Sequence, residues 1–175
     1  VLFIKLDSGI TVGILGLSAM SLPSKEFGIG YVELAFLAYY SSEENVLWIQ
    51  AELTNASYLF HSSCQLTGGF AMVTWFNTGE FVLSLGGYHK NFQVPAYYPT
   101  VSRLGFIWKP SNSLCIKGGT YFTVCTSAVM LGGRLEASYK SGCISAGFWI
   151  GMDVLIVFDP FHYEFEVGMG VYLRV

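Results

Sequence analysis

Residues Tyr163 to Arg174 read YEFEVGMGVYLR, and their alternation decides the fold class. Large apolar side chains stand at every second position from Tyr163 to Leu173, and glutamate, glycine, tyrosine and arginine fill the positions between them. Successive side chains of a β-strand point to opposite faces, whereas a helix cannot bring alternate residues to one side. We therefore predict a strand with one apolar face and one wetter face.

The same period of two recurs along the chain. Leu135, Ala137 and Tyr139 alternate with charged residues and serine, and the stretch from Phe81 to Leu85 behaves in the same way. Groups of turn-forming residues separate such stretches, at Asp7–Gly9, Pro23–Lys25, Ser41–Asn45, Thr54–Asn55, Thr67–Gly69, Asn77–Gly79, Pro110–Asn112, Lys140–Gly142 and Asp159–Pro160. This punctuation predicts an all-β fold, an antiparallel meander of about ten to twelve strands that forms an open curved or two-layered sheet with little or no helix.

Two segments depart from the alternation. Residues 88–100 carry Pro95 and Pro99 among several tyrosines. Proline cannot donate a hydrogen bond to a ladder, so we predict that this segment leaves the sheet as an excursion. Ile10 to Met20 is the one candidate for a helix, and its two glycines weaken that interpretation. We treat residues 1–175 as a single β-rich domain or as a segment of a longer chain.

The stretch from Cys143 to Phe158 is apolar on both faces and is interrupted only by Asp153. Such a strand needs cover on both sides, from a second layer or from a partner. We expect its outward residues Trp149, Leu155 and Val157 to be buried against a partner. The full candidate apolar surface or groove comprises Phe148, Trp149, Ile150, Met152, Leu155, Val157, Phe165 and Met169.

Asp153 has two interpretations, which the sequence leaves open. Its carboxylate is either hydrogen-bonded to a neighbouring strand or a polar anchor in an apolar groove. Gly168 and Gly170 alternate on the last strand and predict the close approach of another sheet or of a ligand.

The composition excludes some classes of protein. Hydrophobic residues make up 53% of the 175 residues and charged residues 12%, about half the usual share, which excludes a disordered chain. Nine Lys and Arg stand against twelve Asp and Glu, so there is no basic footprint and we expect no nucleic-acid partner. The four cysteines show no CxxC spacing, and they form either two disulfides or buried free thiols.

Catalytic motifs are absent from the sequence. There is no GxGxxG, phosphate-binding loop or GxSxG phrase. His162, Glu164 and Glu166 would share one face of a strand, but a solvated polar face is the ordinary explanation for them. We therefore assign no catalytic, cofactor-binding or metal-binding residue and lean against an enzyme. No targeting pattern is visible, and we assign no compartment.

Four phrases in the second half of the chain carry a resemblance. They are Gly86–Phe92, Tyr97–Gly105, Gly132–Ala137 and Asp153–Tyr163. Together they resemble the C-terminal region of an uncharacterised family of large β-rich proteins of bacteria and filamentous fungi, a domain of unknown function. The resemblance implies that the chain is a segment of a longer polypeptide, and it brings no catalytic residues.

Three functions fit these observations. The first is a non-enzymatic structural or interaction module that packs against the rest of a longer parent chain or against copies of itself. The second is a carrier or channel for lipid-like apolar ligands, with a trough lined by Phe148, Ile150, Met152, Phe165 and Met169. The third is a transmembrane β-barrel, although a polar lumen face is missing between Cys143 and Phe158. We favour the first.

Overall fold

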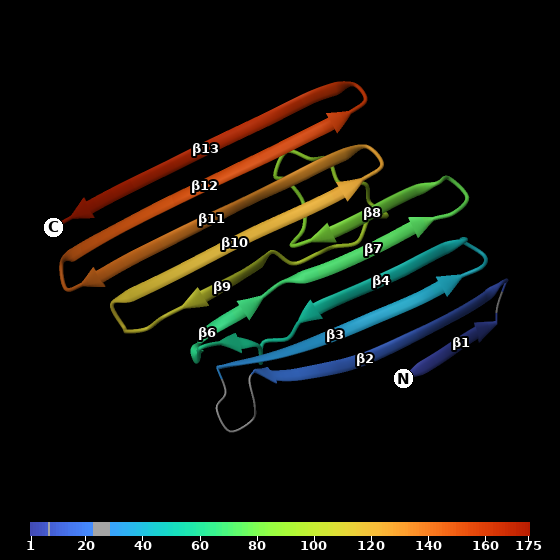
Figure 1. Cartoon of the computed structure of the whole chain (residues 1–175), viewed down its shortest axis with the longest axis horizontal. Coiled ribbons are helices and arrows are strands. Elements are labelled where there is room, and N and C mark those ends of the chain that lie inside the picture. The colour runs from blue at the N-terminus through green and yellow to red at the C-terminus, as the bar shows by residue number, and fades with distance from the viewer. Residues whose placement is uncertain (7, 23–28) are drawn as a thin grey trace.

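The computed structural model describes residues 1–6, 8–22 and 29–175, and it contains one antiparallel sheet of thirteen strands and no helix among them (Figure 1). The expected turn at Pro23–Lys25 and residue Asp7 of the first expected turn lie outside the described residues. The strands are β1 (Leu2–Leu6), β2 (Ile10–Leu22), β3 (Gly30–Ser41), β4 (Val46–Leu53), β5 (Tyr58–Leu59), β6 (His61–Thr67), β7 (Gly69–Trp75), β8 (Glu80–Leu85), β9 (Leu104–Trp108), β10 (Leu114–Cys125), β11 (Ala128–Ser141), β12 (Ile144–Phe158) and β13 (Phe161–Arg174). The predicted all-β meander is confirmed.

The sheet follows chain order from one edge to the other. Six short strands form three collinear pairs, and each pair occupies one row of the sheet. β4 and β5 share the row next to β3, and β6 and β7 share the row after it. β8 and β9 share the following row, which lies next to β10. Seven single strands and these three pairs give ten rows, and Figure 1 shows them running from β1 to β13 in a single layer. Among the described residues β1 and β13 each have one neighbour, so both are edge strands.

Two predicted turns are interruptions within a row and not reversals. At Thr67–Gly69 the chain passes from β6 into β7 in the same direction, and Gly68 takes a φ of +152° there. The segment after Thr54 similarly carries the chain from β4 to β5 along β3. A true reversal occurs between β7 and β8, where Gly79 has a φ of +69°, a conformation that favours glycine. Ile10 to Met20 lies in β2 and is not helical.

The registers give the sheet two chemically different faces. Directly paired residues of antiparallel strands share a face, and on that basis every charged residue of the described strands lies on one side, which we call the charged face. These residues are Lys5, Glu33, Glu52, Glu80, Lys117, Arg134, Glu136, Lys140, Asp153, Glu164, Glu166 and Arg174. The opposite side, which we call the uncharged face, takes no charged side chain from any described strand.

The hydrophobic core lies on the charged face, beneath the segment from Gly86 to Arg103. This segment contains no strand, and Pro95 and Pro99 lie outside every ladder. Its Tyr98 packs with strand residues that are almost fully buried, including Val46, Val73, Val82, Tyr121, Met130 and Leu155. We call this segment the excursion, and it provides a second layer over only part of one face.

The structure also gives the state of the cysteines and the absence of a membrane-spanning helix among the described residues. All four cysteines lie in described residues and have free thiols, with Cys64 and Cys125 buried. The described residues contain no helix long and apolar enough to span a membrane.

Candidate functional site

The uncharged face is open to solvent across the whole width of the sheet. On β13 its exposed side chains include Phe165 and Met169, the latter 72% exposed, and on β1 they include Leu2 and Ile4. The chain as a whole exposes 11024 Å², whereas a compact monomer of this mass would expose about 8,500 Å². The excess accompanies an apolar sheet face that no segment of the described chain covers.

The eight candidate residues divide between the two faces. Phe148, Ile150, Met152, Phe165 and Met169 lie together on the uncharged face, because Ile150 pairs with Met169 and neighbouring residues follow the same register. Each of the five is at least 40% exposed.

The other three candidate residues lie on the charged face and are covered by the same chain. Leu155 is 1% exposed in the core, and Val157 packs against that core. The Arg134 guanidinium lies 4.3 Å from the ring centre of Trp149. The expectation that a partner covers this side of the strand is wrong for Leu155, since the core under the excursion already buries it.

Gly168 and Gly170 are also explained within the chain. A Cβ atom at Gly170 would lie 2.3 Å from Nε1 of Trp149, and one at Gly168 would lie 2.7 Å from Cη2 of the same ring. The close approach predicted at these glycines is therefore made by Trp149 of the neighbouring strand, and not by another sheet or a ligand.

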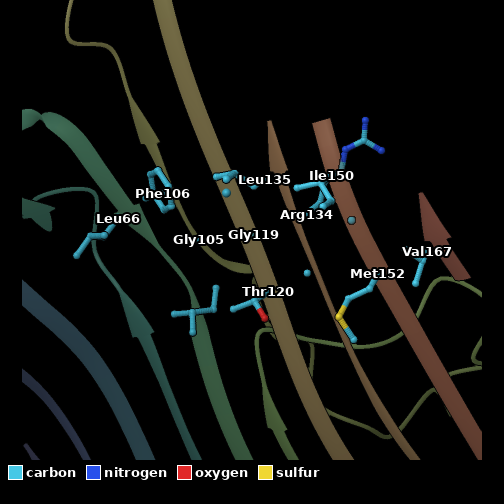
Figure 2. Close-up of a pocket in the computed structure, with 14 residues that line it drawn as sticks. Leu66, Gly105, Phe106, Gly119, Thr120, Arg134, Leu135, Ile150, Met152 and Val167 are labelled. Atoms are coloured by element: carbon cyan, nitrogen blue, oxygen red, sulfur yellow. The ribbon is translucent and has the colours of Figure 1, made fainter. Parts of the chain in front are cut away.

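A groove of about 660 Å³ lies on the uncharged face between β6 and β13 (Figure 2). Leu66 and Phe106 stand on one side of it, and Ile150, Met152 and Val167 stand on the other. Between these walls the floor is formed by small residues of β10 and β11, which include Gly118, Thr120 and Gly133. Ile150 and Met152 were predicted to line a trough, but this floor was not predicted. The signal for it in the sequence is the recurrence of glycine between Gly105 and Gly133.

Gly133 differs from the other glycines of the described strands. Aromatic side chains lie over several of these, for example Phe3 over Gly13, Phe36 over Gly16 and Phe106 over Gly118. A Cβ atom at Gly133 would meet nothing closer than 3.5 Å, whereas every other strand glycine described has an atom within 3.3 Å of that position. Packing within the chain therefore does not require glycine at this point of the groove floor.

A polar network on the charged face holds the excursion and β13 in place. The Tyr121 hydroxyl donates to Oδ1 of Asp153 at 2.7 Å, so the hydrogen-bonded interpretation of Asp153 is confirmed. Lys90 forms an ion pair with Glu166, and Asn91 donates to Glu164 at 2.6 Å. These contacts occupy the two glutamates that share a face with His162.

Burial raises the pKa of three tyrosines around the core well above the ordinary value. For Tyr88, Tyr98 and Tyr121 the loss of solvent contact is the largest cause. Hydrogen bonds to Glu80 and Asp153 raise the pKa of Tyr98 and Tyr121 further. In residues 1–6, 8–22 and 29–175 no group of three or more His, Cys, Asp or Glu side chains is placed to hold a metal ion. The site is thus an apolar surface with a groove, and the described strands place no carboxylate, lysine or arginine side chain on it.

The comparison with protein families supports the expectation of an uncharacterised family. The model of the Family of unknown function (DUF6603) matches residues 1–175. The chain belongs to this family. The match covers the whole chain, whereas the four phrases that carried the resemblance all lie in its second half. No curated protein and no solved structure matches the chain.

Proposed function

We propose that this chain is a structural module whose role is to pack its uncharged face against a second apolar layer. One observation carries the proposal, namely that every charged residue of the described strands lies on the opposite face. An exposed apolar patch wider than a few hundred Å² usually marks an interaction surface.

The size of the face fits a permanent contact. Ten rows about 4.8 Å apart and strands of up to 15 residues at about 3.3 Å per residue give a face on the order of 2,000 Å². Two such faces in contact would bury on the order of 4,000 Å², which lies within the range of obligate interfaces. The covering layer is itself an uncharged sheet face, and for the chain expressed alone it is that of a second copy.

Methionine oxidation tests this proposal directly. Met169 is 72% exposed in the single chain and Met130 is fully buried, so the two report the uncharged face and the core. If the face is covered in solution, dilute peroxide will oxidise Met169 nearly as slowly as Met130 at high protein concentration, and faster on dilution. Oxidation of Met169 at the rate of a free methionine at every concentration would contradict the proposal. Mass spectrometry of the peptides provides the measurement.

A further inference from the structure

We propose that the groove on the uncharged face is a binding site for an unbranched alkyl chain, such as the acyl chain of a lipid. This goes beyond the packing role, because it assigns a ligand to one defined part of the face. The groove is bounded by Leu66 and Phe106 on one side and by Ile150, Met152 and Val167 on the other (Figure 2).

The chemistry of the lining selects an uncharged occupant. Among the described residues that line the groove, Arg134 alone is charged, and its guanidinium stacks on Trp149 on the charged face. The hydroxyl of Thr120 is already used, since it donates to the carbonyl oxygen of Gly132 at 2.8 Å. Charge complementarity therefore requires an occupant without charge or unsatisfied polar groups along its buried length.

A peptide segment does not meet this requirement. The strands beneath the groove are paired on both sides, β9 with β6 and β10, β11 with β10 and β12, and β12 with β11 and β13. β13, which carries Val167, is paired with β12, and its free edge lies on the side away from the groove. A peptide entering the groove would bring N–H and C=O groups that find no backbone partner there. An alkyl chain brings none, and a volume of about 660 Å³ lies in the usual range of small-molecule sites.

A second sheet face alone also leaves the groove poorly filled. Packed sheets meet through side-chain tips about 10 Å apart, and protein interiors tolerate few voids larger than a water molecule. Gly133 deepens the floor without being required by any contact of this chain. A flexible alkyl chain fills such a depression without a matching ridge on the covering layer.

The test is a substitution on the groove floor that occupies the space of the proposed ligand. The 175-residue chain is titrated with cis-parinaric acid, a fatty acid that fluoresces when its chain is buried, and the probe is displaced with hexadecanol, which has an alkyl chain and no carboxylate. Gly133→Leu places a side chain in the groove with no contact under 3.5 Å at its Cβ, and it should weaken probe binding about tenfold or more. Ala137→Leu adds a leucine on the same strand and face outside the groove, and it should leave binding within about twofold.

A second variant guards against misfolding. Val167 is 62% exposed on the edge strand β13, so Val167→Trp narrows the groove without entering the core and should also weaken binding. The proposal is overturned if the unmodified chain does not bind the probe, if hexadecanol fails to displace it, or if the groove variants bind as tightly as Ala137→Leu. It is also overturned if Gly133→Leu lowers the mass in solution while probe binding is unchanged, because the groove would then be filled by a second copy. The Met169 oxidation result is independent of these outcomes.

Discussion

Gly132 and Gly133 are adjacent on β11 and face opposite sides of the sheet. A Cβ atom at Gly132 would lie 2.3 Å from Oδ1 of Asp153 and 2.6 Å from Cε1 of Tyr121, whereas one at Gly133 would have 3.5 Å of clearance. We expect Gly132→Ala to lower the free energy of unfolding by about 1–3 kcal/mol through overpacking. Gly133→Ala should be neutral or stabilising, since alanine reduces the entropy of the unfolded chain.

Chemical denaturation of the two variants measures this difference. Both variants replace a glycine of β11 by alanine and so add one methyl group, and each is therefore the control for the other. Equal destabilisation would show that the Tyr121–Asp153 contact above Gly132 does not limit the space there.

The buried tyrosines predict a loss of stability at alkaline pH. Burial raises the pKa of Tyr98 and Tyr121 in the folded chain above the ordinary value. In the unfolded chain a tyrosine keeps its ordinary pKa of about 10. Their contribution to stability is therefore complete below about pH 10 and is lost as the pH rises toward the folded pKa. We expect the free energy of unfolding to fall above about pH 10. The fall should be shallower in Tyr98→Phe, and an identical pH profile for that variant would refute the assignment.

At the scale of elements, the excursion is predicted to stabilise the sheet through Tyr98. This side chain is 6% exposed, stacks on Trp75 at 5.6 Å and donates to Glu80. Tyr97 also donates to Glu80 but is 52% exposed. Replacement of Tyr98 by alanine should cost about 3–5 kcal/mol, as for other large core aromatics, and Tyr97→Ala about 1 kcal/mol or less.

Thermal or denaturant unfolding of the two alanine variants gives the comparison. A similar loss for both would mean that the shared hydrogen bond to Glu80, and not burial of the ring in the core, accounts for the stabilisation.

The strands also show which features of the fold the alternation of residues can predict. The alternation from Tyr163 to Arg174 predicted β13 because each residue's face follows from its position along the strand. The same pattern could not distinguish a reversal from an interruption at Thr67–Gly69, because glycine permits both. Residues Cys143–Phe158 were predicted to need cover on both sides. The excursion covers one side of this strand, because Tyr98 packs in the core that contains Leu155. These two residues are far apart in the sequence, so local pattern could not predict the contact.

At the scale of the whole molecule, the separation of charge becomes visible only from the registers. Each strand shows which of its residues share a side, but pairing is needed to learn that Arg134 and Glu166, on different strands, lie on the same face. A slip of one residue in any pairing would bring charges to the uncharged face. The groove likewise depends on Gly118, Thr120 and Gly133 meeting across two strands.

The arrangement is consistent with a module that is completed by another apolar layer. A sheet of ten rows with two open edges and one uncovered apolar face has little to prevent association. The charged face, with its partial cover and its ion pairs, is the side suited to water.

The mass of the chain in solution tests this central claim most directly. Residues 1–175 are measured by light scattering over a range of concentrations, beside a variant with Phe165→Glu and Met169→Glu on the uncharged face and a control with Ser138→Glu and Ser145→Glu on the charged face. We predict that the unmodified chain and the control have masses of at least twice 19.3 kDa, and that the uncharged-face variant approaches the monomer. A monodisperse 19.3 kDa monomer that binds no apolar dye would contradict the claim.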